Sequence, residues 1–333
     1  MTAPIFNRGG HCVLFTKYHK LRKETMKSNT DWFKDAKWGV FTHYLTGKET
    51  TAEVWNSQID NFNVDGLVEQ LKATGTPYYF ITIGQNSGHY CSPNDTYDSF
   101  VGIKPSKCSK RDLIMELADA LTKEGIRLMV YLPSGAPAAD PVAMERLGWE
   151  WGYEGQWPSG GPKRTGKRLA EFQLKWEKII REWSLRWGNK VHGWWIDGCY
   201  FSDEMYRHDD PPNFKSFAYA LKVGNPESII AFNPGVKTPV ITLTEYEDYT
   251  AGEISTIFPI CPNRWLNGTQ YHILSYLGER WGHGEPRFVD EFVVGYTKDV
   301  NSKGGVVTWD VPIDISGLIP QKFIDQLNLI GKI

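Results

Sequence analysis

The sequence VHGWWIDGCY occupies residues 191–200 and begins as a short apolar run. Such a run is typical of a strand that is buried on both faces of a parallel sheet. The run stops at Asp197, and Gly198 after it allows the backbone to turn away. In a barrel of alternating strands and helices, catalysis takes place at this end of the strands. The stretch therefore predicts a catalytic carboxylate, provided that the rest of the chain builds such a barrel.

Strands and helices alternate regularly through the first 200 residues. β-branched and aromatic runs predict strands at 37–44, 78–83 and 126–132. Apolar residues at helical spacing predict helices at 64–74, 110–124 and 169–187, and Ser109 is expected to cap the second of them. This alternation favours a parallel barrel or a doubly wound sheet.

The pattern after residue 200 is less regular. We expect helices at 213–223, 287–301 and 321–330, and strands at 228–232 and 305–311. Residues 133–166 are rich in glycine, proline and tryptophan and predict a long active-site loop, and residues 245–253 form an acidic loop. We expect residues 1–30 to be an N-terminal extension and residues 31–333 to form one domain, because no linker, repeat or low-complexity tract divides them.

Composition narrows the class of function. With 37 Lys and Arg against 39 Asp and Glu, the chain has no basic excess for nucleic acid or an acidic membrane surface. No apolar stretch approaches the ~20 residues of a membrane span, and the N-terminus lacks a secretory signal pattern. We therefore expect a cytoplasmic protein, or a periplasmic or secreted one if a signal peptide has been removed. The 14 Trp residues suit either sugar binding or a large core.

Metal and cofactor chemistry finds no support in the sequence. The five cysteines are scattered without C-x-x-C spacing, and their positions leave a single disulfide, such as Cys91–Cys108, as an alternative. No His, Asp and Glu set has metal-ligand spacing, and neither a glycine-rich phosphate loop nor a G-x-S-x-G motif occurs. We expect no metal and no cofactor.

Five segments occur in the same order as in glycoside hydrolase family 29, the α-L-fucosidases. They are DWFKDAKWGVFTHY (31–44), CSKRDLIMELADALTKEGIRLMVYLPS (108–134), GWWIDGCY (193–200), DYTAGEIS (248–255) and VDEFVVGYTKDVNSKGGVVTWDVPIDISGLIP (289–320). The chain resembles this family from about Trp32 to its C-terminus. The resemblance implies a (β/α)8 TIM-like barrel, here irregular in its second half, and a retaining mechanism. It also implies that Asp197 is the nucleophile and that His43, Glu53 and Tyr131 contact the sugar.

The chain departs from the family after its second predicted strand. The family typically has a His-His pair there, which holds the fucose hydroxyls. This chain reads GQNSGHY at 84–90, with Gln85 and Asn86 at the expected position and His89 slightly beyond. We also expect the chain to lack the family's C-terminal β-sandwich. We expect Gln85, Asn86 and His89 to determine which substrate is preferred.

Hydrolysis of a glycosidic bond needs a second carboxyl group beside Asp197, to protonate the leaving oxygen. Glu253 lies in the segment that matches the family and is the favoured acid/base. Glu245 and Glu247 in the same acidic loop stay open, and all three could instead be solvated loop residues. Asp197 itself could be an ordinary turn residue before Gly198.

Several aromatic and polar residues are expected to bind substrate. Trp195, two residues before Asp197, should point the same way as the acid and either stack on a sugar or fill the barrel. Trp55, Trp265 and Trp281 are expected in the pocket wall. Glu53 could also be a surface carboxylate, and Arg264 could bind an acidic sugar or form a surface salt bridge.

The sequence therefore predicts a retaining, exo-acting α-L-fucosidase-like glycosidase. Its expected partner is a carbohydrate substrate, an oligosaccharide or a glycoconjugate, and no oligomeric state is indicated. Two alternatives stay open. One keeps the fold and mechanism but changes the sugar, and the other is a catalytically disabled carbohydrate-binding protein.

Overall fold

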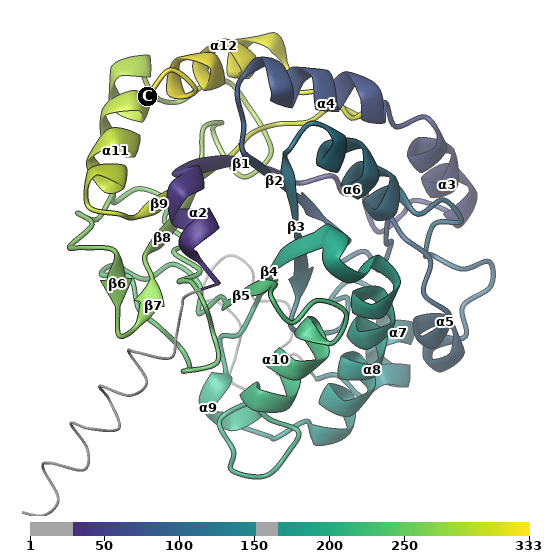
Figure 1. Cartoon of the computed structure of the whole chain (residues 1–333). Helices are drawn as coiled ribbons and strands as arrows, with labels where there is room; N and C mark the ends of the chain where they lie inside the picture. The colour runs from purple at the N-terminus through teal and green to yellow at the C-terminus, as the bar shows by residue number, and fades with distance from the viewer. Residues whose placement is uncertain (1–28, 151–165) are drawn as a thin grey trace, which may run out of the picture.

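A computed structural model of the protein describes residues 29–150 and 166–333. Seven parallel strands form one curled sheet, and helices surround it (Figure 1). The strands in spatial order are β5 (Ile229–Phe232), β4 (Val191–Asp197), β3 (Arg127–Pro133), β2 (Tyr78–Thr82), β1 (Trp38–Thr42), β9 (Val306–Asp310) and β8 (His272–Tyr276). The expected extension at residues 1–30 lies, apart from its last two residues, outside the described residues.

An irregular segment spans the gap between the two edge strands, β5 and β8. The amide nitrogen of Asp248 donates to the carbonyl oxygen of Ile230 in β5, at 2.8 Å. At the segment's other end, Leu274 of β8 donates to Gly252 at 2.9 Å and accepts from Ile254 at 3.0 Å. Backbone hydrogen bonds thus continue round the barrel where no regular strand forms. The predicted α/β TIM-like barrel, irregular in its second half, is confirmed.

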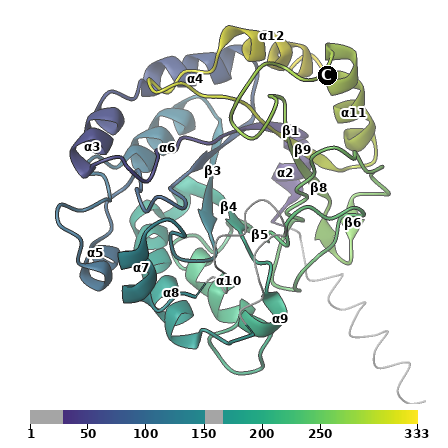
Figure 2. The same cartoon turned by 180° about the vertical axis from the view of Figure 1, so that it is seen from behind.

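The described helices surround the barrel, with α2 at one end and most of the others around the outside, as both views show (Figures 1 and 2). They are α2 (Asp31–Ala36), α3 (Ala52–Asp60), α4 (Val64–Ala73), α5 (Asp95–Val101), α6 (Leu113–Lys123), α7 (Pro141–Leu147), α8 (Ala170–Trp187), α9 (Ser202–Met205), α10 (Phe214–Lys222), α11 (Asp290–Ser302) and α12 (Gln321–Ile330). A short 3-10 turn (Gly188–Lys190) leads into β4, and a hairpin pairs β6 (Trp265–Leu266) with β7 (Thr269–Gln270).

Helix α2 covers the end of the barrel at which the strands begin. Its Phe33 is fully buried and packs on Tyr78, Tyr249 and His272, with ring centroids 5.0 to 5.3 Å apart. Tyr78 and His272 are the first residues of β2 and β8. The opposite end, where the strands finish, is therefore the end left for a site.

Alternation along β4 sorts its side chains between two cores. Trp194 and Ile196 belong to the core between sheet and helices, whereas Trp195 belongs to the cluster inside the barrel. Asp197 is two residues further on and lines an internal cavity together with Trp195. The prediction that Trp195 points the same way as Asp197 is confirmed.

Local predictions failed or missed an element at several places. Helix α7 lies within the predicted loop at 133–166, whose residues 151–165 fall outside the described residues. Residues 52–60 form helix α3, which the sequence analysis did not predict; Thr51 accepts from the nitrogen of Val54, and Ala52, Trp55 and Ile59 bury one face. Asp112, not Ser109, caps α6 by accepting from Met115 at 3.0 Å. Strand β8 was not predicted at all.

The expectations about cysteine pairing and about membrane-spanning helices can be compared with the described residues. The four cysteines among them are buried and free, so Cys91 and Cys108 are not paired. No helix in the described part of the chain combines the length and the apolar character needed to cross a membrane.

Candidate active site

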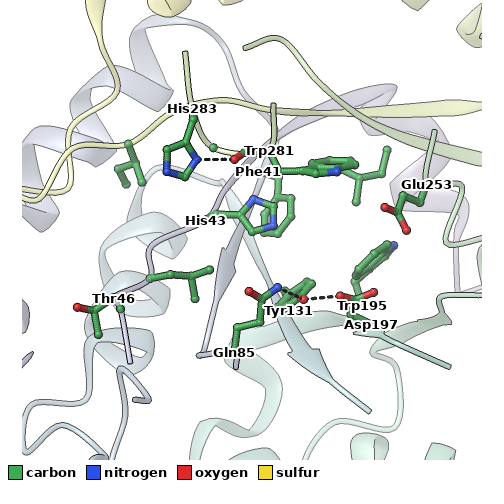
Figure 3. Close-up of a pocket in the computed structure, with 15 residues that line it drawn as sticks. Phe41, His43, Thr46, Gln85, Tyr131, Trp195, Asp197, Glu253, Trp281 and His283 are labelled. Atoms are coloured by element: carbon green, nitrogen blue, oxygen red, sulfur yellow. Dashed lines mark hydrogen bonds between the residues drawn. The ribbon is translucent and has the colours of Figure 1, made fainter. Parts of the chain in front are cut away.

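Polar side chains from several strands meet where the strands end, around a cavity of about 590 Å³ (Figure 3). We call this the first cavity. Strand β4 supplies Asp197 and β3 supplies Tyr131, while His43 follows the end of β1. The lining residues are Phe41, His43, Leu45, Thr46, Gly47, Gln85, Tyr131, Trp195, Asp197, Glu253, Leu274, Trp281, Gly282, His283 and Ile313. The cavity therefore lies where an α/β barrel carries its chemistry.

Several donors hold the carboxylate of Asp197. The hydroxyl of Tyr131 donates to Oδ2 at 2.6 Å. The backbone nitrogen of Gly198 and the side-chain nitrogen of Asn233 donate to Oδ1, at 2.7 and 2.8 Å. The position of Gly198 is thus explained, because the turn after β4 brings its N–H back onto the carboxylate. These contacts fix one orientation of Asp197 toward the first cavity.

Glu253 is the second carboxyl group in the first cavity. It belongs to the irregular segment and bridges Leu274 of β8, and its Oε2 accepts from Asn233 at 2.6 Å. Burial, reinforced by the negative charge of Asp197, raises the pKa of Glu253 to about 7, against the opposing effects of Asn233 and His43. Near neutral pH, Glu253 therefore holds a proton part of the time, as a general acid must.

Asn233 links the two carboxyl groups through one atom. Because its Nδ2 lies 2.8 Å from Asp197 and 2.6 Å from Glu253, the two acceptor oxygens are at most about 5.4 Å apart. Its Oδ1 accepts from the nitrogen of Gly235 at 3.1 Å, which fixes the orientation of the amide. The sequence analysis did not name Asn233 as a site residue, although it directly follows the apolar strand β5.

His43 is oriented by a buried acid at the end of β9. Its Nδ1 lies 2.7 Å from Oδ1 of Asp310, whose side chain is fully buried. The nitrogen of Gly282 donates to the other oxygen of Asp310 at 2.6 Å. Burial raises the pKa of Asp310, and His43 opposes this. With Nδ1 engaged, Nε2 is the ring nitrogen of His43 that is available to a ligand.

Aromatic and amide groups complete the walls of the first cavity. Trp195 stacks on Tyr131, with ring centroids 5.5 Å apart, and its Nε1 donates to the carbonyl of Ala251 at 3.0 Å. Trp281 lies 5.8 Å from the His43 ring. Gln85 donates to the hydroxyl of Tyr131 at 2.5 Å. Trp195, Trp281 and Gln85, which the sequence singled out, thus share the first cavity with both carboxyl groups.

Other residues singled out by the sequence lie elsewhere. Trp265 is exposed in the hairpin strand β6 and does not line the first cavity, so its prediction as a pocket-wall residue was wrong. Trp55 is buried in the core under α3 and donates to the carbonyl of Tyr90 at 2.9 Å. Glu53 is exposed on the same helix. His89 is buried, its ring nitrogens have no hydrogen-bond partner among the described residues, and burial lowers its pKa to about 4. Asn86 lines a second cavity that adjoins the first.

The two other candidate acids are placed differently from Glu253. Glu247 is buried, accepts from the nitrogen of Leu243 at 2.7 Å, and is not among the residues lining the first cavity. Burial raises its pKa to about 8. Glu245 is exposed. Of the three, Glu253 alone faces Asp197 across a shared donor.

His283 lies in the first cavity, whereas Arg264 lies at the surface. His283 lines the first cavity and was not predicted there; its Nδ1 lies 2.7 Å from the carbonyl of Trp281. Arg264 forms an ion pair with Asp31 at the surface, at 2.5 Å, which is the salt bridge that the sequence left open. No group of three or more His, Cys, Asp or Glu among the described residues is placed to hold a metal ion.

A barrel that ends in two facing carboxyl groups, lined by aromatic rings, defines the class of glycoside hydrolases. The sequence matches the family model described as α-L-fucosidase over residues 46–333. The chain belongs to this family, which confirms the resemblance drawn from its sequence. No curated protein gives a significant sequence match.

Solved structures share the fold. An endo-fucoidan hydrolase of glycoside hydrolase family 107 aligns with a TM-score of 0.69 and 18% identity, over 91% of this chain and 53% of that one. An α-L-fucosidase from Lactobacillus casei aligns at 0.59 and 17%, over 91% and 97%. One from Paenibacillus thiaminolyticus aligns at 0.59 and 18%, over 91% and 74%. The chain spans 53% and 63% of the length of two of the endo-fucoidan hydrolases and 92% of a third, and these identities show the fold alone.

Proposed function

We propose that the chain is a retaining glycosidase that removes a terminal fucose or a related sugar from a carbohydrate. The separation of Asp197 and Glu253 carries this proposal. Retaining enzymes hold their two carboxyl groups ~5–5.5 Å apart, whereas inverting enzymes leave ~6.5–9.5 Å for a water molecule. The shared contact with Asn233 limits the acceptor oxygens to about 5.4 Å, which supports a double displacement.

In this mechanism Asp197 attacks the anomeric carbon while protonated Glu253 gives its proton to the leaving oxygen. The glycosidic bond breaks, the leaving group departs as an alcohol, and the sugar is joined to Asp197 as an ester. Glu253, now a carboxylate, takes a proton from a water molecule that attacks the same carbon. The sugar is released, Asp197 regains its carboxylate and Glu253 regains its proton. The raised pKa of Glu253 suits this exchange.

The rest of the first cavity suits a sugar ring. Nε2 of His43 is available to a hydroxyl group, because Asp310 occupies Nδ1. Trp281 offers an aromatic face beside His43 for the apolar face of a sugar. Tyr131 holds the nucleophile in place by its hydrogen bond to Oδ2 of Asp197. These contacts support a complex in which the anomeric carbon lies between Asp197 and Glu253.

The deciding experiment is hydrolysis of an aryl α-L-fucoside by the wild type and by Asp197→Ala. We expect the variant to lose almost all turnover, whereas Asp209→Ala, which alters an exposed aspartate, keeps it. Unchanged turnover in Asp197→Ala would contradict the proposal. Proton NMR of the first product released reports the anomeric configuration, and free monosaccharide from an oligosaccharide distinguishes exo from endo action.

A different sugar is the second candidate, and the contacts of Gln85 favour it. Its side-chain nitrogen donates to Tyr131, while Asn86 faces the second cavity. Gln85 therefore offers its amide oxygen rather than its nitrogen to the first cavity, and Asn86 does not line that cavity, so the polar groups there differ from a histidine pair. A panel of aryl glycosides separates the candidates, since activity on the α-L-fucoside alone would exclude a different sugar. Binding of sugars by the wild type without any turnover would instead support a carbohydrate-binding protein.

A further inference from the structure

Gln85 makes a contact that the proposed mechanism does not use. It lies just after strand β2, and its Nε2 donates to the hydroxyl of Tyr131 at 2.5 Å. That hydroxyl donates in turn to Oδ2 of Asp197 at 2.6 Å. The row runs across the ends of three neighbouring strands, β2, β3 and β4 (Figure 3). Nε2 of Gln85 is therefore at most about 5.1 Å from the carboxylate of the proposed nucleophile.

The number of protons in this row fixes the direction of both hydrogen bonds. A tyrosine hydroxyl has one proton to donate, whereas a carboxylate can only accept. Burial, and then the negative charge of Asp197, raises the pKa of Tyr131 well above its ordinary value, so the hydroxyl keeps its proton. This proton can be donated to Asp197 only if the hydroxyl oxygen accepts from its other neighbour. The amide of Gln85 must therefore present its nitrogen, and not its oxygen, to Tyr131.

Packing fixes the ring of Tyr131 but does not fix its hydroxyl proton. The ring stacks on Trp195 and on Phe41, with ring centroids 5.5 and 5.8 Å apart, and these contacts hold the phenolic oxygen in place. A hydroxyl group rotates to suit its partners, so the donor on Gln85 is what turns the proton toward Asp197. Donation to a hydroxyl also strengthens the bond that this hydroxyl donates, by roughly 10–30%.

The loop that carries Gln85 is held in place without help from the Gln85 side chain. The carbonyl of Asn86 accepts from the nitrogen of Ala139 at 2.9 Å. The carbonyl of Ser87 accepts from Nζ of Lys107 at 3.2 Å. Replacement of the Gln85 side chain should therefore leave the loop where it is. An effect of the replacement on catalysis can then be assigned to the lost amide.

We propose that Gln85 is a positioning residue for the nucleophile. By donating to Tyr131, its amide commits the tyrosine proton to Asp197 and so stabilises the ionised carboxylate in one orientation. Gln85 acts through Tyr131 in this role and needs no contact with the sugar. The proposal rests on the proposed function, because Asp197 must be the nucleophile.

The test compares two substitutions of Gln85 by pH–rate profiles on an aryl α-L-fucoside. Gln85→Met has a similar length but no donor, whereas Gln85→His can place an N–H as many bonds from the backbone as the amide nitrogen. We expect Gln85→Met to lower kcat/KM about 2- to 10-fold, the range for one neutral hydrogen bond. Its acid limb, where the nucleophile takes up a proton, should move to higher pH by about 0.3–1 unit. Gln85→His should leave the acid limb in place, as should the control Gln321→Met at an exposed position in α12.

The other titratable groups around Asp197 come from several elements. They are Tyr131 of β3, Cys199 and Tyr200 after β4, Glu253 of the irregular segment and, beyond the Tyr131 ring, His43 after β1. None of them is replaced in Gln85→Met, and the substitution exchanges one neutral side chain for another. A shift of the acid limb in this variant therefore reports the lost donor.

A double-mutant cycle with Tyr131→Phe shows whether Gln85 acts through the tyrosine. With the hydroxyl absent, Gln85→Met should change kcat/KM less than about twofold. Equal losses in both backgrounds, or an acid limb that stays in place in Gln85→Met, would overturn the proposal while the proposed function stands. Unchanged turnover in Asp197→Ala would instead remove the proposed function. If Gln85→Met lacks a cooperative thermal transition, Gln85→Ala takes its place in both experiments.

Discussion

Asp197 and Glu253 accept hydrogen bonds from the same atom, Nδ2 of Asn233, at 2.8 and 2.6 Å. Asp197 ends β4, Asn233 directly follows β5, and Glu253 lies in the irregular segment that spans the gap in the barrel. One amide therefore sets both the spacing of the two carboxyl groups and part of their electrostatics. Its hydrogen bond stabilises the ionised form of Glu253, while the neighbouring charge of Asp197 favours the protonated form.

Replacement of Asn233 tests this balance. In Asn233→Ala the carboxylate of Glu253 loses a donor, so its pKa should rise above about 7. The alkaline limb of kcat/KM, where the acid loses its proton, should move to higher pH. The maximal rate should fall about 10- to 100-fold, as expected for a charge-assisted bond of ~1.5–3 kcal/mol. The measurement is a pH–rate profile, with Asn61→Ala, at an exposed helix end, as the control. An unmoved alkaline limb would contradict the role given to Asn233.

The identity of the acid is tested by two matched substitutions, Glu253→Gln and Glu247→Gln. General acid catalysis contributes roughly 10²–10⁴-fold, so Glu253→Gln should lose activity on that scale toward fucosides with poor leaving groups. The loss should shrink for a dinitrophenyl leaving group, which needs no proton. Glu247 does not line the first cavity, so Glu247→Gln should stay within a few-fold of the wild type. The reverse order of these losses would assign the acid to Glu247.

The regular half of the fold was predictable because its local signals agree with its burial. Strands β1 to β5 and β9 are apolar runs, and every residue of β1, β2, β5 and β9 is buried. Strand β8 was not predicted from the sequence because some of its buried side chains are polar. Its His272 contacts the carbonyl of Thr250 and the hydroxyl of Thr308, at 2.9 and 2.7 Å. Such partners are far away in the sequence, so periodicity cannot reveal them.

The site was predictable only in part. Asp197 was predicted because it is an acid at the end of an apolar strand. Asn233 directly follows another such strand, β5, and Asp310 is the last residue of β9. The same rule applied to amides and to the last strand would have found both. The burial of Trp55 and the exposure of Glu53 follow from helix α3. The Thr51 cap and the apolar spacing of residues 52, 55 and 59 were the missed signals.

Asp310 is expected to act by positioning His43. In Asp310→Asn the charged acceptor for Nδ1 of His43 is lost, while an amide oxygen can still accept from Gly282. We expect kcat/KM to fall about tenfold, mainly through KM, because the sugar contact of His43 weakens. A double-mutant cycle separates positioning from a merely structural role. Asp310→Asn should cost little more once His43→Ala is present, and additive losses would show that Asp310 acts independently of His43.

The buried Glu247 should make stability fall with rising pH. Burial raises its pKa in the folded protein to about 8 from an ordinary value near 4.5. The folded state therefore holds this proton more tightly than the unfolded state, and its contribution is complete below pH ~4.5 and is lost as pH rises through 8.

Glu247→Gln keeps an acceptor for the nitrogen of Leu243 and removes the titration. Urea unfolding at pH 5 and pH 8.5 should show that the wild type loses more free energy of unfolding between these values than the variant does, by more than about 1 kcal/mol. Glu253→Gln is the comparison, because the pKa of Glu253 rises only to about 7 and its substitution should remove a smaller part of the fall. The same pH dependence in Glu247→Gln and in the wild type would show that Glu247 does not titrate in this range. The fall in the free energy of unfolding would then have to arise from other titrating groups.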